Sequence, residues 1–217
     1  MKALRLIVIL LLLLVTAGSL LYPQTLTLRG SSALELNIGF WNNMNASQQL
    51  SFSGITQDAK AGGFVGGLTY CYWMREHVAI TVAGALLSSQ TSTAVLASPA
   101  IVKQNSSGLA SFLFGIRYVV PEPAPEDLIR PYVAVGVGSF MGFESDNSLL
   151  LQSAHSESVV GGRLGVGLDA YPGSSVKLGV AAGYNTMASF RSAVGARSNF
   201  DGFDFSMSIA YIFGGSL

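Results

Sequence analysis

Large apolar side chains recur at every second position in eight separate segments of the chain. In the last segment the odd-numbered positions are apolar or aromatic, namely Phe205, Met207, Ile209, Tyr211 and Phe213. The residues between them are mostly small, and a period of two is typical of a β-strand with one apolar face. The same alternation predicts strands at residues 31–41, 63–74, 78–87, 109–119, 131–139, 159–171, 175–184 and 201–213.

The segments that join these strands alternate between short and long. The short joins are residues 75–77, the proline-rich residues 120–128 and the Pro-Gly-Ser-Ser turn at residues 172–175. The long joins are rich in Ser, Asn, Gln and Gly and cover residues 42–61, 87–108, 141–157 and 185–200. Short turns at one end and long polar loops at the other are typical of an outer-membrane barrel. An even number of strands then places both termini at the short-turn, periplasmic end.

The composition indicates that the apolar faces lie against lipid. Half of the residues are hydrophobic and only 11% are charged, against about 25% in ordinary soluble domains. Lipid-facing strands explain this without any long apolar run, and a sheet that spans a membrane must pair its first strand with its last. We therefore expect an all-β fold, an eight-stranded antiparallel up-and-down transmembrane β-barrel preceded by a signal peptide. A soluble, lipocalin-like barrel is the alternative, and it would need charged outward positions.

The first residues have the three-part layout of a secretory signal peptide. Lys2 and Arg5 precede an apolar run at residues 6–15, and small residues follow, with Ala17 the preferred cleavage position and Ser19 the second. We expect residues 1–19 to be the signal peptide and residues 30–217 to form the barrel domain. An uncleaved membrane anchor is the alternative reading of this segment.

The charge, cysteine and histidine content argues against a nucleic-acid partner, an internal disulfide and a metal site. Without Lys2 and Arg5 the chain has 10 Lys and Arg (12 minus 2) against 12 Asp and Glu, so no basic surface indicates nucleic acid. The single Cys71 cannot form an internal disulfide. No pair of His or Cys residues has the spacing of a metal site, and we expect no cofactor.

Three stretches of the chain resemble a known family. They are RPYVAVGVG at residues 130–138, GGRLGVGLDAY at residues 161–171, and the terminal strand with its aromatic residues. On these residues, the chain after the signal peptide resembles the small eight-stranded outer-membrane barrels of the OmpA/OmpX type. The resemblance implies a position among the lipids of the bacterial outer membrane and recognition of the last strand by the barrel-assembly machinery. The residues that would be recognised are Phe205, Tyr211 and Phe213, although four residues follow Phe213 here.

Charged residues also occur at positions that the alternation directs into the lumen. These are Glu35, Arg117, Arg163, Asp169 and Lys177. An eight-stranded barrel is only wide enough to be filled by side chains. We expect a structural charge network that plugs the lumen, since an unpaired buried charge is expensive. A proton or ion path with a gate is the alternative.

One polar stretch, SAHSES at residues 153–158, has the residue types of esterase chemistry. Some eight-stranded barrels are lipid A deacylases with His and Ser two positions apart on one strand. Ser153 and His155 have that spacing in the reverse order, and Glu157 is a nearby acid. An ordinary polar loop end is the simpler interpretation.

The function expected from these observations is a non-enzymatic outer-membrane protein. Its four long loops would provide adhesion, contact with a host or the envelope, or the barrel would give structural support. A lipid A deacylase-like esterase is the second hypothesis, and a narrow pore is the third.

Overall fold

The computed structural model describes residues 28–43, 50–52, 55–59, 62–95, 101–121, 129–148, 151–194 and 197–214. The strands are β1 (Ser32–Asn43), β2 (Leu50–Phe52), β3 (Ile55–Ala59), β4 (Gly62–Arg75), β5 (Val78–Val95), β6 (Ile101–Val119), β7 (Ile129–Ser148), β8 (Leu151–Ala170), β9 (Val176–Met187) and β10 (Gly202–Phe213). Within these ranges no helix has the length and apolar character needed to cross a membrane.

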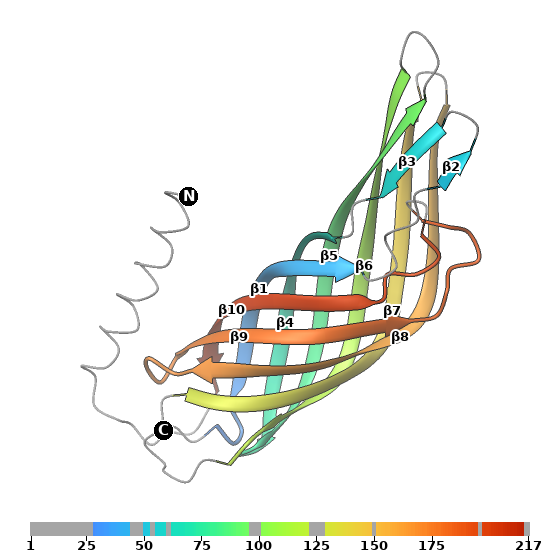
Figure 1. Cartoon of the computed structure of the whole chain (residues 1–217). Coiled ribbons are helices and arrows are strands. Elements are labelled where there is room, and N and C mark those ends of the chain that lie inside the picture. Colours follow the sequence, from blue (N-terminus) through green and yellow to red (C-terminus); the bar gives the residue numbers. More distant parts are fainter. Residues whose placement is uncertain are drawn as a thin grey trace, which may run out of the picture.

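Eight of the strands close into one antiparallel ring (Figure 1). The order around the ring is β1, β4, β5, β6, β7, β8, β9 and β10. The ring closes where β1 pairs with β10 over its whole length, from Ser32 opposite Phe213 to Asn43 opposite Gly202. Closure gives each strand of the wall two partners, so its backbone groups are satisfied without water. The predicted eight-stranded up-and-down barrel is confirmed, including the pairing of the last strand with the first.

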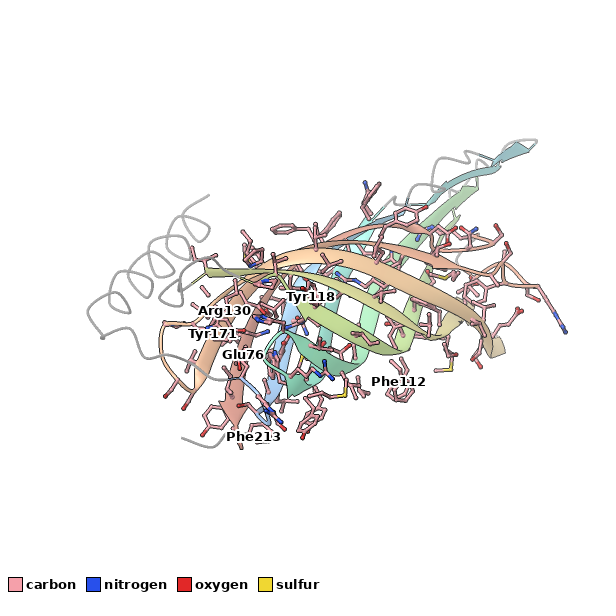
Figure 2. The ribbon with its side chains drawn as sticks, turned by 90° about the horizontal axis from the view of Figure 1, so that it is seen from below. Glu76, Phe112, Tyr118, Arg130, Tyr171 and Phe213 are labelled. Atoms are coloured by element: carbon pink, nitrogen blue, oxygen red, sulfur yellow. The ribbon has the colours of Figure 1, made fainter. Side chains whose placement is uncertain are left out.

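The side chains alternate between the two faces of the wall as the sequence predicts. The large apolar residues of one parity are exposed, and Leu34, Phe112, Val166 and Ile209 among them are 50–55% exposed. Phe112 stands away from the wall in Figure 2. On the opposite parity, Arg117 is 6% exposed and Lys177 is completely buried. The outer face is therefore apolar and the ionic side chains lie in the lumen, which is the reverse of a soluble lipocalin-like barrel.

The predicted extents of the long loops were wrong, because strands occupy much of them. Most of residues 87–108 belongs to β5 and β6, and most of residues 141–157 belongs to β7 and β8. Residues 42–61 contain β2 and β3, and β3 pairs with the end of β5. These parts lack apolar alternation because neither of their faces lies against lipid, whereas the backbone hydrogen bonds of a ladder need no apolar side chains. The alternation therefore marked only the membrane-embedded part of each strand.

One half of the wall consequently extends farther than the other (Figure 1). β5, β6, β7 and β8 have 18, 19, 20 and 20 residues, while β1, β4, β9 and β10 have 12 to 14. Because the short turns align at the periplasmic end, the difference lies at the extracellular end. We call β2, β3 and the parts of β5–β8 beyond Ser88, Gly108, Met141 and Val160 the extension.

The outward position of Val166, in the middle of the membrane-embedded part of β8, allows a test of lipid contact. A Val166→Arg substitution should lower the free energy of unfolding from a bilayer by about 2–4 kcal/mol, which is the cost of a lipid-facing cation near the midplane. Urea titration of the protein in phospholipid vesicles measures this. Ser174→Arg, in the exposed turn between β8 and β9, is the control and should change the folding free energy little. Equal effects of the two substitutions would contradict a lipid-facing wall.

Candidate functional site in the barrel lumen

Four charged residues from four strands meet near the periplasmic end of the lumen. Arg117 of β6 donates two hydrogen bonds to the Glu35 carboxylate of β1, with nitrogen–oxygen distances of 2.6 and 3.0 Å. Lys177 of β9 bonds to the same carboxylate and donates to Asp169 of β8 at 3.1 Å. Arg117 also reaches Asp169 at 3.3 Å. These contacts join strands on different sides of the ring, and we call the four residues the lower network.

The lower network is almost completely removed from water and is balanced in charge. Its side chains are 7% exposed or less, and two cations face two carboxylates. Asp169 lies opposite Gly179 in the ladder, so Lys177 is one diagonal away, as expected for two residues that flank the same turn. The structure thus brings Glu35, Arg117, Asp169 and Lys177 together.

Arg163 lies apart from the lower network and pairs with Asp204 of β10. Its guanidinium donates to both carboxylate oxygens, at 2.9 and 2.6 Å, and the Asn185 amide donates to Asp204 at 2.6 Å. Glycines make room for this pair: a Cβ at Gly183 would lie 2.6 Å from a guanidinium nitrogen of Arg163, and a Cβ at Gly165 would lie 2.8 Å from another. We call Arg163, Asp204 and Asn185 the upper pair site.

Asp204, Asn185 and Tyr132 were not among the lumen residues predicted from the sequence. Asp204 shares the inward parity of the small residues of β10, and this signal was available in the alternation. Tyr132 lines the lumen beside Arg117, whose guanidinium carbon lies 4.3 Å from the ring centroid, a cation–π geometry. A Cβ at Gly167 would lie 2.6 Å from the Tyr132 hydroxyl, so the ring covers a glycine of the neighbouring strand.

Residues 28–31 close the periplasmic end of the lumen. Gly30, in a left-handed conformation with φ of 78°, allows a turn in which the Ser31 amide donates to the Leu28 carbonyl at 2.9 Å. Gly30 and Ser31 also exchange backbone hydrogen bonds with Trp73, which is fully buried with Leu28 in one apolar cluster. Figure 2 shows Glu76, Arg130 and Tyr171 near this end, where the Arg130 guanidinium carbon is 5.2 Å from the Tyr171 ring centroid.

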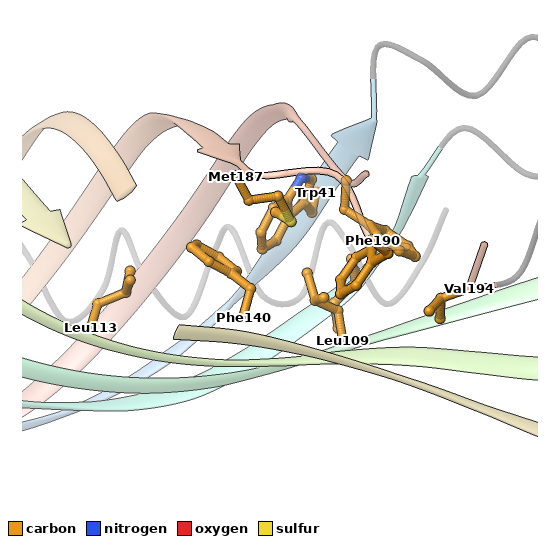
Figure 3. Packing of buried hydrophobic residues seen from close by; sticks show 9 residues of the cluster. Trp41, Leu109, Leu113, Phe140, Met187, Phe190 and Val194 are labelled. Carbon is orange, nitrogen blue, oxygen red and sulfur yellow. The ribbon is translucent and has the colours of Figure 1, made fainter. Parts of the chain in front are cut away.

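A larger apolar cluster closes the extracellular end. Figure 3 shows most of it, and its buried members are Trp41, Leu87, Leu109, Leu113, Phe140, Met187, Phe190, Val194 and Phe200. Three of these come from the segment between β9 and β10, residues 188–194 and 197–200, which we call the capping segment. The rings of Phe190 and Phe200 meet edge to face at 6.1 Å. We call the whole cluster the apolar cap.

Polar contacts hold the capping segment on the barrel. The Glu157 carboxylate of β8 accepts hydrogen bonds from the amides of Arg191 and Ser192, at 2.7 and 3.0 Å. At the base of the segment, Asp201 accepts from the Met187 amide at 2.7 Å. Arg197 of this segment is buried, and burial lowers the pKa of its guanidinium from the ordinary value, whereas Arg191 and Ser192 are exposed. Glu157 therefore has a structural contact.

The side chains of Ser153 and His155 lie outside the described residues, although the backbone of β8 passes through both positions. His155 is the ladder partner of Glu144 on β7. An acidic residue is therefore the ladder partner of the histidine, and it is not the Glu157 named in the prediction.

The aromatic residues of the last strand all lie on the outer face. Phe205, Tyr211 and Phe213 are 44–62% exposed, and the rings of Tyr211 and Phe213 stack with centroids 6.1 Å apart. Aromatic side chains at strand ends suit the interfacial girdles of outer-membrane barrels. Their recognition by the assembly machinery stays a prediction.

The lower network makes a sharp prediction about Lys177. Lys177→Met leaves two buried carboxylates facing one cation and should lower the free energy of unfolding by about 3–5 kcal/mol. The double variant Lys177→Met/Asp169→Asn restores the charge balance and should recover part of that loss. Urea unfolding, followed by heat-modifiable gel mobility, measures both. If the double variant is no more stable than the single one, charge balance does not govern this site.

Comparisons with known proteins agree with this architecture. Over residues 10–213 the sequence matches the model of the outer membrane protein beta-barrel domain. The structure is similar to that of the outer membrane protein OprG from Pseudomonas aeruginosa, with 13% identity, a TM-score of 0.61, and coverage of 88% of this chain and 99% of that chain. It is also similar to Neisserial surface protein A, with 13% identity, a TM-score of 0.55, and coverage of 85% and 97%. The search of curated proteins gave no match. A closed ring of eight strands, an apolar outer face and this match along almost the whole sequence show that the chain belongs to the family of outer membrane protein beta-barrel domains.

Proposed function

We propose that this chain is a non-enzymatic outer-membrane protein whose plugged barrel holds a β-structured contact surface outside the cell. The signal peptide at residues 1–19 and the assembly signal in β10 belong to the same proposal, since a barrel of this family needs export and insertion. The observation that carries the contact function is the extension, in which four strands continue past the barrel wall (Figure 1).

In the extension the edge of β8 that faces β9 in the barrel is open. β8 pairs with β9 only from Gly161 onward, whereas its pairing with β7 continues to Leu151. On the open side, within the described residues, the Ala188 amide donates to the Val160 carbonyl. The backbone groups of Val160 therefore face the open side, and by alternation those of Ser158 and Ser156 face it too. Such an edge can accept an extended segment of a partner as an additional strand.

The charge of the β7–β8 hairpin favours a basic partner. Residues 141–160 contain Glu144, Asp146 and Glu157 and no Lys or Arg. Opposite charges across an interface steer association and select the partner. The expected partner is thus a basic, extended polypeptide segment on a host or neighbouring cell surface, and it would first meet residues 141–157, one of the four predicted loop segments. The segments 42–61, 87–108 and 185–200 would complete the contact surface.

Proline substitution tests the open edge, because it removes an amide donor. Ser156→Pro/Ser158→Pro deletes two donors on the open side and keeps the ladder with β7, whereas Ser156→Ala/Ser158→Ala removes the hydroxyls and keeps the amides. The probes are synthetic peptides of alternating Lys and Thr, or Glu and Thr, with binding followed by fluorescence anisotropy. The Lys peptide should bind, and only the proline variant should lose that binding. Equal binding of both peptides, or equal loss in both variants, would refute edge docking.

A hydrolase is the second candidate, and the ladder register favours it. Ser153 and His155 are two positions apart in β8, and Glu144 is the ladder partner of His155. This order of serine, histidine and acid matches the residue types of nucleophilic catalysis. The substrate would be an ester of lipid A at the outer leaflet.

Lipid A analysis separates the two candidates. Cells that express wild-type protein, His155→Ala or Glu144→Gln should have the same lipid A acyl content if the protein is non-enzymatic. Mass spectrometry of extracted lipid A measures it. A wild-type loss of one acyl chain that disappears in both variants, but persists in Ser158→Ala, would instead establish the hydrolase.

A further inference from the structure

A cavity of about 140 Å³ lies in the lumen between the lower network and the apolar cap. This is close to the size of an engineered protein cavity that binds benzene, at about 150 Å³. Its boundary includes Arg117 and Tyr132 near the lower network, Arg163 and Asp204 at mid-height, and Trp41 and Leu113 from the apolar cap. The cavity is therefore polar at one end and apolar at the other.

The charges around the cavity already balance among themselves. Arg117, Lys177 and Arg163 face Glu35, Asp169 and Asp204 in ion pairs, which makes three cations and three anions. An ion entering this space would bring an uncompensated charge into a medium of low dielectric constant, at high cost. The cavity chemistry therefore selects a neutral occupant.

Two buried donors at opposite ends of the cavity have no hydrogen-bond partner among the described residues. They are the indole nitrogen Nε1 of Trp41 and the guanidinium nitrogen Nε of Arg117. The two residues are 4% and 6% exposed. Buried donors in folded proteins nearly always have an acceptor. An occupant with a carbonyl or similar oxygen supplies one, and its apolar part fits against Leu113.

The two ends of the lumen present unequal barriers to such an occupant. The path to the periplasm leads through the lower network, where four buried charges would have to separate, and then past Trp73 and Leu28. The path to the outside leads through the apolar cap, whose outermost part is the capping segment held by Glu157. Displacing apolar side chains breaks no ion pair, so exchange with the exterior is easier.

We propose that this cavity is a binding compartment for one small, neutral, hydrogen-bond-accepting molecule, and that the capping segment is its outer door with Glu157 as the latch. The inference does not rest on edge docking, because the cavity lies in the lumen; only its latch, Glu157, belongs to the extension. The lower network then keeps the barrel closed to ions, while the cavity exchanges a solute with the exterior.

The two tryptophans of the chain provide the assay. Trp73→Phe removes the fully buried periplasmic indole, which has no hydrogen-bond partner among the described groups, and leaves Trp41 at the cavity as the only reporter. Acrylamide, a small neutral amide and fluorescence quencher, is the probe, and iodide is the charged control. In this background, quenching by acrylamide should saturate, as for a bound quencher, while iodide should have little effect.

Two further substitutions test the compartment and its door. Ala83→Leu fills the cavity from β5 and should abolish the saturable quenching, whereas Ala110→Leu adds the same atoms on the outer face of β6 and should preserve it. Glu157→Gln should raise the rate at which acrylamide reaches Trp41 several-fold. Each variant must retain heat-modifiable gel mobility.

The outcomes decide the proposal. Linear quenching without saturation, or saturation that survives Ala83→Leu, would show that the cavity holds only water. Strong quenching by iodide would refute neutral selection, and an access rate unchanged by Glu157→Gln would refute the latch. The quenching measurements use neither the peptides nor the proline variants, so the two proposals fail separately.

Discussion

The hydrogen-bonding requirement of the peptide backbone in hydrocarbon governs this structure. A lipid-exposed sheet edge has no water to bond, so a spanning sheet has to close, and here β1 and β10 pair over their entire lengths. Eight strands then fix the diameter, and the narrow lumen must be filled by side chains. The apolar outer face, the small inward residues and the buried ion pairs all follow from that closure.

The lumen is filled in layers of different chemistry. From the periplasm outward these are an apolar cluster around Trp73, the lower network, the cavity with the upper pair site, and the apolar cap. Charges are tolerated in the two middle layers because each has an oppositely charged partner at hydrogen-bonding distance. Glycines at positions 165, 167 and 183 leave room for the large polar side chains that cross the lumen. The ionic layers thus depend on the glycine positions as much as on the charges.

The unequal lengths of the strands divide the molecule into a fully paired ring in the membrane and an extension outside it that is available for contact. The membrane-embedded part of the ring has a paired partner on both sides of every strand, while the extension keeps an open edge on β8. An open edge outside the membrane is hydrated and costs little, so it is available for a partner. The membrane-embedded ring can have every strand paired while the extension keeps accessible backbone groups, because the ring lies in lipid and the extension lies in water.

The sequence by itself determined the strand periodicity, the eight membrane-embedded strands, the lipid-facing residues and four members of the lower network, because the bilayer imposes a strict period of two. It did not reveal the length of β5–β8 outside the membrane, since polar strands there carry no apolar alternation. The separation of Arg163 from the lower network, its pairing with Asp204, and the insertion of Phe190, Val194 and Phe200 into the apolar cap were decided by tertiary structure. Those contacts join residues whose proximity depends on the stagger and closure of the whole ring, which parity along a single strand does not contain.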